Sequence, residues 1–287
     1  RWLYFKIYLG HDSYHRFLQS EMRDLLADLQ AMEEVSRFFF LPFTDPDFHL
    51  RIRIRVTDSS VYQSLAKKMQ TLLANVKSKY HISRVVQDTY QPEVLRYGAP
   101  TIDLAEEIFT HDSHFLIQQF EKFQQTHPTH LPFRMMCSID ALLQAFGLSA
   151  LEKKNFLTSL SETYAEEFAV KEKNAERQSI NQLLRKHKQL IQKYLDPDKR
   201  PALLDADLRT ALAAFEHTIR QAYTRQASKF RSTAALHDFL RSIIHMHCIR
   251  NFVTDPRLNE LFLYLGLAEY YTALLFRQKK SVKINDL

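Results

Sequence analysis

An alternating run of basic and apolar residues occupies positions 49–56 of the chain. Side chains on a β-strand point in turn to opposite faces, so the basic members share one face: His49, Arg51, Arg53 and Arg55. Arginines two positions apart lie about 7 Å from each other and repel unless an anion lies across them. Because the guanidinium fork matches a carboxylate or a phosphate, this face predicts an anion-binding site. The alternative is the solvated outer face of an antiparallel sheet.

A further candidate arginine lies in a constrained loop. The segment 90–100 contains two prolines that restrict the backbone, and Gly98, which reaches conformations that other residues disfavour. Loops of this kind often place functional groups, and Arg96 is the candidate here. The alternative is a surface loop in which Arg96 pairs with Glu93.

Two histidines, His245 and His247, lie inside a helical pattern in the second half of the chain. Residues two apart on a helix point about 200° away from each other, so their rings cannot share a metal ion, and we predict no metal site. His245 shares its predicted face with Arg241 and Cys248. A neighbouring cation lowers the pKa of a histidine and keeps it a neutral base near pH 7. The alternative is a structural histidine in the core.

The composition and the missing motifs narrow the function classes. The sequence has no GxGxxG, P-loop or GxSxG pattern, so a nucleotide site and a serine hydrolase have no support. Its two cysteines, Cys137 and Cys248, form no CxxC pair and indicate a reducing compartment. No apolar run approaches the roughly 18 residues that span a bilayer. The net charge of +6 suits an acidic partner, but basic charge alone is weak support for nucleic-acid binding.

The elements that would position these residues fall into two halves. Residues 1–100 predict the order strand, helix, strand, strand, helix, strand, over 2–9, 11–32, 37–42, 49–56, 59–79 and 82–90. This is the split βαβ, ferredoxin-like order, an α+β arrangement with a small antiparallel or mixed sheet. Residues 101–287 predict a large helical portion, over 102–125, 134–146, 150–195 with a break, 202–227, 233–252 and 257–276. We expect one domain over 1–287, with a change of layer rather than a domain boundary near residue 100.

Five segments, in this order, resemble the C-terminal glutamate-elimination domain of class I lanthipeptide dehydratases, which also occurs in thiopeptide-type bacteriocin biosynthesis proteins. They are WLYFKIY at 2–8, HLRIR at 49–53, PEVLRYG at 92–98, IF at 108–109 with DS at 112–113, and HMH at 245–247. The family continues the last segment with x-Asn-Arg, whereas this chain has Cys248-Ile249-Arg250 and places Asn251 one position later. Any support that the asparagine gives to the histidine is therefore expected to be missing or rearranged here.

The resemblance implies a lyase that acts after a separate glutamylating domain or protein. That partner uses glutamyl-tRNA to esterify Ser or Thr of a leader-bearing precursor peptide, and the elimination domain then expels glutamate to leave dehydroalanine or dehydrobutyrine. Catalytic roles pass by resemblance to Arg51, Arg53, Arg96 and His245. We predict substrate-binding roles for residues near them: His49, Arg55, Tyr97 and Arg250. The expected protein is cytoplasmic, needs no cofactor, binds neither tRNA nor membrane, and is free to form a homodimer.

Two other functions stay open on the sequence. A pyridine-forming cycloaddition enzyme of thiopeptide pathways uses the same fold on pairs of dehydroalanines, but such enzymes tend to lose the arginine set that this chain retains. A non-catalytic peptide-binding subunit is the third hypothesis, and the altered asparagine keeps it open. The sequence leaves undecided which group is the base, and whether the chain is the smaller half of a split dehydratase or a domain of a longer protein.

Overall fold

The computed structural model describes residues 1–125, 130–170 and 174–285, with side chains described outside 120–125, 167–170, 174–177 and 280–285. The chain divides into two compact units, one formed by residues 1–122 and 225–253 and the other by 123–224 and 254–287. All of the residues predicted to form a site belong to the first unit. The single domain expected for the whole chain stays a prediction.

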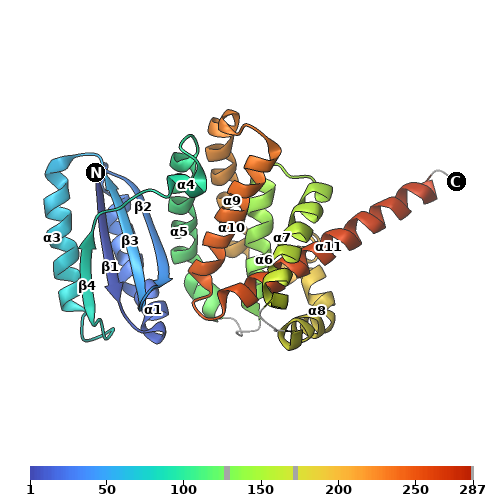
Figure 1. Ribbon diagram of the computed structural model, residues 1–287, viewed down its shortest axis with the longest axis horizontal. Coiled ribbons are helices and arrows are strands. Elements are labelled where there is room, and N and C mark those ends of the chain that lie inside the picture. The colour runs from blue at the N-terminus through green and yellow to red at the C-terminus, as the bar shows by residue number, and fades with distance from the viewer. Residues whose placement is uncertain (126–129, 171–173, 286–287) are drawn as a thin grey trace. The chain divides into compact units, whose positions relative to one another are not determined.

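An antiparallel four-stranded sheet forms the N-terminal part of the first unit (Figure 1). The strands are β1 (Trp2–Tyr8), β2 (Val35–Thr44), β3 (Phe48–Val56) and β4 (Arg84–Asp88). Their order is β2-β3-β1-β4, and each neighbouring pair runs antiparallel. This is the ferredoxin-like order that the sequence predicts, and the α+β fold class is confirmed.

The two connections between strands supply the helices that cover the apolar side of the sheet. The first is a continuous helical stretch made of α1 (His11–Phe17), the π-helical turn η1 (Leu18–Met22) and α2 (Arg23–Gln30). The second is α3 (Ser59–Asn75), which begins where the Asp58 carboxylate accepts a hydrogen bond from the Ser60 amide. Because α2 packs on β2 and α3 on β3, four apolar side chains of β3 are at most 1% exposed: Leu50, Ile52, Ile54 and Val56.

The remaining helices of the first unit lie beside the sheet edge formed by β2. They are α4 (Val94–Tyr97), α5 (Ile102–Gln125) and α10 (Thr233–Asn251), with a 3-10 turn, η4 (Ala227–Lys229), before α10. The Phe40 amide donates to Ser113 Oγ on α5, and the Phe40 carbonyl accepts from Arg250 Nε on α10. An uncovered edge strand is an aggregation hazard, so these two bonds protect the edge as well as fasten the helices. The short α4 replaces part of the loop that the sequence predicts.

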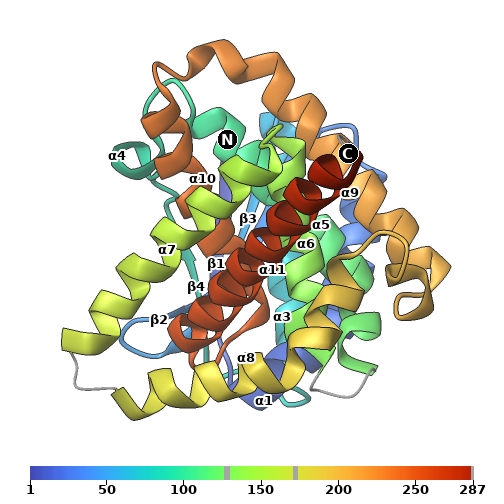
Figure 2. The same cartoon turned by 90° about the vertical axis from the view of Figure 1, so that its right-hand side faces the viewer.

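The second unit is helical throughout its described residues. Its helices are α6 (Leu131–Ala145), α7 (Ala150–Val170), α8 (Asn174–Leu195), most of α9 (Ala206–Gln226) and α11 (Pro256–Asn285), with a 3-10 turn, η3 (Arg200–Ala202). Helices α7 and α11 pack along one another (Figure 2). The predicted break inside 150–195 falls at 171–173, outside the described residues. Among the helices that the structure describes, none has the length and apolar character needed to cross a membrane.

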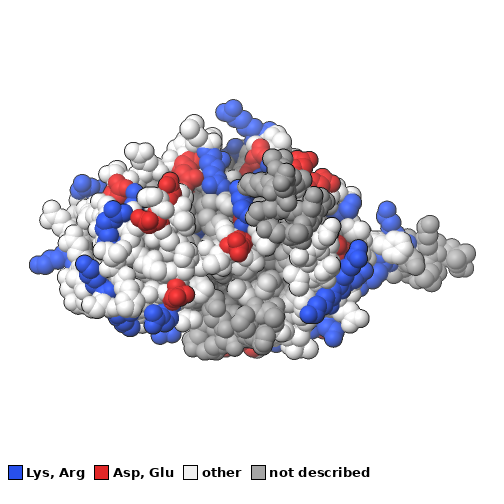
Figure 3. All heavy atoms as spheres, turned by 60° about the horizontal axis from the view of Figure 1, so that its bottom comes forward, with Lys and Arg blue, Asp and Glu red and all other residues white. Residues whose placement is uncertain are grey.

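The charges are mixed on the surface that Figure 3 presents. Over the sheet of the first unit, Lys and Arg side chains lie among Asp and Glu side chains. The net charge of +6 therefore does not gather into one basic patch on that face.

Candidate anion-binding site

The register of the sheet explains how β3 carries four basic residues on one face. Arg53 lies between Tyr4 of β1 and Phe39 of β2, and His49 lies between Tyr8 and Phe43. The faces of aromatic rings attract cations, so the aromatic residues of the flanking strands stabilise the basic face. The alternative of a solvated face is wrong at two positions, because His49 is 1% exposed and Arg53 is 6% exposed.

Three aromatic rings form a cage around Arg53. Its guanidinium carbon lies 5.0 Å from the ring centroid of Tyr4, 5.2 Å from that of Phe39 and 4.8 Å from that of Tyr90. Its Nε is buried without a hydrogen-bond partner, and no carboxylate pairs with it among the residues that the structure describes. Burying an unpaired ion costs several kcal/mol. An anionic ligand is the partner that would recover this cost.

Arg51 is held in place by His49. Arg51 Nε donates to His49 Nε2 at 3.0 Å, and His49 Nδ1 lies 2.8 Å from the Asp47 carbonyl. Because a carbonyl accepts and a guanidinium donates, His49 must be the neutral tautomer with its proton on Nδ1. Burial is the main cause that lowers the pKa of His49, and the charge of Arg51 adds to it. The Arg51 guanidinium also lies 3.4 Å from the centroid of the Phe43 ring.

Arg96 and Tyr97 belong to α4, and the Tyr97 ring packs against those of Phe109 and Phe239. Glu93 Oε2 lies 3.5 Å from Arg96 Nη1, as the surface-loop alternative predicts. Burial lowers the pKa of Arg51, and the negative charge of Glu93 is among the influences that oppose this shift. Burial raises the pKa of Tyr97, and the charges of Arg96 and Arg53 are among those that oppose it. The joining of Arg96 with Arg51 and Arg53 in one site stays a prediction. Gly98 has a φ of 79°, which confirms its predicted role in the turn.

Arg250 belongs to a second cluster, which we call the buried brace: Asp112, His247 and Arg250. The two Asp112 oxygens lie 2.6 Å from His247 Nδ1 and 2.7 Å from Arg250 Nη1. Burial raises the pKa of Asp112, but His247 and Arg250 outweigh it, so the pKa is lowered. These contacts and the bond to Phe40 engage Arg250 in the fold. They lend no support to substrate binding by Arg250, which stays a prediction.

The sequence analysis assigned no role to Asp112 or His247, although both lie in segments that carry the family resemblance. The signal was present as DS at 112–113 and as the second histidine of HMH, but nothing in the sequence pairs the two. They lie 135 positions apart and meet only because α5 and α10 are neighbours. Asn251 donates from Nδ2 to the His247 carbonyl, so the displaced asparagine serves the end of its own helix.

His245 and Arg55 have less defined places. His245 is half-buried on α10, and that helix packs on α4 through the Tyr97 and Phe239 rings, whose centroids are 6.1 Å apart. Arg55 lies 3.4 Å from Asp103 Oδ1 and 5.9 Å from the Trp2 ring centroid. Their roles in the site stay predictions. Among the described residues, no group of three His, Cys, Asp or Glu side chains is arranged to hold a metal ion.

Known proteins share both the sequence and the fold of this chain. The family model described as lantibiotic biosynthesis dehydratase C-term matches residues 2–271. The subtilin biosynthesis protein SpaB of Bacillus subtilis is 25% identical over 92% of this chain and 25% of its own length. The nisin biosynthesis protein NisB of Lactococcus lactis subsp. lactis is 34% identical over 39% of this chain and 11% of its own length. The chain thus spans about a quarter of the SpaB sequence.

Two solved structures extend the comparison. The tRNA dependent lantibiotic dehydratase MibB from Microbispora sp. 107891 has a TM-score of 0.75 and 21% identity, covering 96% of this chain and 28% of MibB. The pyridine synthase TbtD from thiomuracin biosynthesis has a TM-score of 0.59 and 13% identity, covering 95% of this chain and 99% of TbtD. At these identities the structures show a shared fold alone. The match of the family model over 2–271 shows that the chain belongs to the lantibiotic biosynthesis dehydratase C-terminal family.

Proposed function

We propose that this chain eliminates glutamate from glutamylated Ser or Thr of a precursor peptide, leaving dehydroalanine or dehydrobutyrine. The observation that carries the proposal is Arg53, a buried cation caged by rings without a carboxylate, with Arg51 two positions away on the same strand. Membership in the dehydratase family supports a role in peptide dehydration. Because the chain spans about a quarter of SpaB, the substrate and the partners are parts of the proposal.

The chemistry of the elimination explains the need for cations. A base removes the α-proton of the modified residue, its electron pair forms the Cα–Cβ double bond, and the bond from Cβ to the ester oxygen breaks. Glutamate leaves as a carboxylate, so negative charge develops where the ester had none. Guanidinium groups already in place stabilise this charge and hold the other glutamate carboxylate through paired hydrogen bonds.

His245 is our candidate for the base. Histidine is the side chain that most often serves as a general base, and His245 lies on α10, which packs on α4. We expect His245→Ala to leave peptide binding intact and to slow elimination by about 10²- to 10⁴-fold, the usual worth of a general base. Unchanged elimination in this variant would exclude the role.

The glutamyl ester must be made elsewhere. MibB is described as tRNA dependent, and this chain matches 28% of it, so we assign tRNA use to a separate glutamylating domain or protein that hands over the modified peptide. The chain would then complete the dehydration that this partner begins.

The likeness to TbtD keeps cycloaddition as a second candidate. A pyridine synthase joins two dehydroalanines and expels no glutamate during that bond formation. It therefore has no use for a buried arginine without an anionic partner such as Arg53, and we rank elimination first. A peptide-binding subunit without turnover is distinguished by the same experiment.

The test is mass spectrometry of a synthetic glutamylated-serine peptide incubated with the wild type, Arg51→Ala and Arg96→Ala. We expect the wild type to release glutamate and leave dehydroalanine, and both variants to lose this activity. Arg23→Ala is the matched control, because Arg23 is an exposed arginine of α2 beside Asp24. An untouched peptide after incubation with folded wild type would refute elimination, and a peptide with two dehydroalanines would then test cycloaddition.

A further inference from the structure

Tyr90 contacts both the caged arginine and a buried carboxylate. Its ring centroid lies 4.8 Å from the Arg53 guanidinium carbon, and its hydroxyl donates to Glu106 Oε1 at 3.0 Å. The Trp2 ring packs against the same tyrosine at 4.8 Å between centroids. Tyr90 follows β4 and Glu106 lies on α5, so this tyrosine links the basic face of the sheet to a neighbouring helix.

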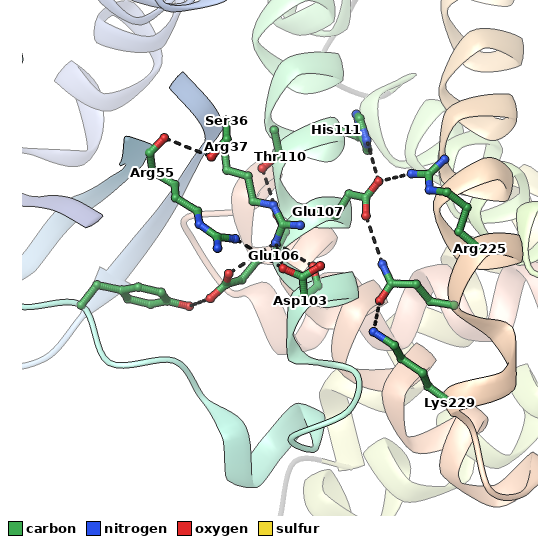
Figure 4. A network of polar contacts seen from close by, with 12 residues as sticks. Ser36, Arg37, Arg55, Asp103, Glu106, Glu107, Thr110, His111, Arg225 and Lys229 are labelled. Carbon is green, nitrogen blue, oxygen red and sulfur yellow. Dashed lines mark hydrogen bonds and ion pairs between the residues drawn. The ribbon is translucent and has the colours of Figure 1, made fainter. Parts of the chain in front are cut away.

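Glu106 is held from a second side by Arg37, as Figure 4 shows. Its Oε2 lies 3.4 Å from Arg37 Nη1, and Arg37 is also 2.9 Å from Asp103 Oδ1. Glu106 is 5% exposed. Burial raises its pKa, and the Tyr90 hydroxyl and Arg37 oppose that shift in part. Burial also raises the pKa of Tyr90, so its hydroxyl keeps the proton that it donates.

We propose that Tyr90 and Glu106 form a positioning pair that keeps Arg53 available to the substrate anion. A carboxylate and a guanidinium attract strongly when both are buried, because the interior screens charge poorly. An ion pair between Glu106 and Arg53 would take the cation away from substrate. The Tyr90 hydroxyl engages the carboxylate while its ring forms one wall of the cage. The inference rests on the proposed function, and it adds two residues that do not themselves touch substrate.

The same helix offers a matched control. Glu107, the next residue of α5, pairs with Arg225 and accepts from Gln226 at 3.2 Å (Figure 4). It is a carboxylate with similar partners that contacts neither Tyr90 nor the cage. For the phenol, the control is Tyr62 of α3, whose hydroxyl accepts from Gln87 at 3.3 Å and whose ring lies 4.9 Å from the Arg1 guanidinium carbon.

The first experiment measures KM and kcat for the glutamylated peptide in Tyr90→Phe, Glu106→Gln and the double variant. Tyr90→Phe keeps the ring but frees Oε1 of the Glu106 carboxylate, so we expect KM to rise about tenfold, the worth of one hydrogen bond to a charged group, with a smaller change in kcat. The double variant should recover most of this loss, because Glu106→Gln puts a neutral amide in place of the carboxylate that would compete for Arg53. Tyr62→Phe and Glu107→Gln should match the wild type.

If Tyr90 and Glu106 only stabilise the fold, we expect a different result. The loss would then follow the fall in Tm, and the double variant would be as impaired as Tyr90→Phe or worse. Either result would overturn the positioning pair, because removing the charge of Glu106 would then have failed to restore the availability of Arg53.

The second experiment needs no substrate and separates this inference from the proposed function. The Arg53 Nε–H signal is followed by ¹⁵N NMR in the full chain, with Arg53→Lys to assign it. We expect the exchange of this proton to slow in Tyr90→Phe, because the Nε–H has no acceptor in the wild type and the freed carboxylate can accept it, and to return toward the wild-type rate in the double variant. If the wild type releases no glutamate, the proposed function fails while this signal still decides the pair. Identical exchange in wild type and Tyr90→Phe would overturn it.

Discussion

Two arginines of the first unit are buried to nearly the same degree but have opposite surroundings. Arg53 is 6% exposed and Arg250 is 1% exposed. Arg250 donates to Asp112 and to the Phe40 carbonyl, so its charge is compensated by the chain itself. Arg53 has three rings around it and no carboxylate partner among the described residues. The first arrangement holds helices to a sheet, and the second leaves a buried cation without an anionic partner among the described residues.

The contrast has a thermodynamic basis. Removing one partner of a buried ion pair leaves the other charge uncompensated, which is strongly destabilising. Replacing an unpaired buried cation with an apolar side chain removes a desolvation cost and is neutral or stabilising. Functional sites commonly retain such unfavourable groups, because activity needs them. Stability and activity should therefore respond in opposite ways at the two arginines.

The largest effect is expected from breaking the buried brace. Asp112→Ala should lower the free energy of unfolding by about 3–5 kcal/mol, the cost of leaving one member of a buried ion pair alone, measured by urea denaturation. Asp103→Ala, at a half-exposed ion pair on the same helix, is the control and should cost less than about 1 kcal/mol. Equal losses in the two variants would contradict the brace.

The same aspartate gives a pH dependence with a defined sign. Its pKa is lowered in the folded protein, so its contribution is complete above the unfolded value of about 3.9 and is lost as the pH falls through the lowered folded value. The stability difference between wild type and Asp112→Ala should thus be constant near neutral pH and shrink below about pH 4. A difference that grows on acidification would reverse the assigned sign.

The caged arginine should show the opposite pattern. We expect Arg53→Met to lower kcat/KM for elimination by about 10²- to 10³-fold, the cost of removing one group that stabilises developing negative charge. Its free energy of unfolding should stay within about 1 kcal/mol of the wild type or rise. Arg250→Met is the matched comparison, and its free energy of unfolding should fall well below that of Arg53→Met. If Arg53→Met lost as much stability as Arg250→Met, the two arginines would not differ in the way described.

A smaller effect is expected where His49 orients Arg51. His49 Nε2 accepts from Arg51 only while the imidazole is neutral, and burial lowers the pKa of this histidine. Acid should therefore release Arg51, so kcat/KM should fall at pH values below the usual histidine pKa of about 6.5. His49→Gln should lower the plateau by about tenfold, the worth of a hydrogen bond to a charged group, and abolish this acid limb. An acid limb that persists in His49→Gln must belong to another group.

The smallest effect is expected at the margin of the basic face. The Arg55 side chain is 42% exposed and Asp103 is 50% exposed, so their ion pair is screened by solvent. Arg55→Gln should change the free energy of unfolding by less than about 1 kcal/mol. Its effect on elimination should be far below that of Arg53→Met. A comparable effect would extend the site from Arg51 and Arg53 to Arg55, as the sequence analysis predicts.

Local periodicity carried much of the fold. The alternation at 49–56 predicts a strand with one basic face, and β3 has that face. The helix predicted over 102–125 is α5 with the same ends, because its apolar residues recur with the helical period. The pairing of Arg96 with Glu93 was also predictable, because residues three positions apart lie on one turn of the backbone.

The site itself depended on contacts between distant segments. Tyr90 lies beside Arg53 and Arg250 meets Asp112 only after strands and helices have packed, and no local pattern pairs residues 37 or 138 positions apart. The sequence by itself determined the fold class and the strand order and supplied the candidates for anion binding, because these follow from periodicity and side-chain chemistry. Only the tertiary structure decided that Arg250 pairs with a carboxylate and that Arg53 pairs with none among the described residues, because that depends on which side chains packing brings within reach.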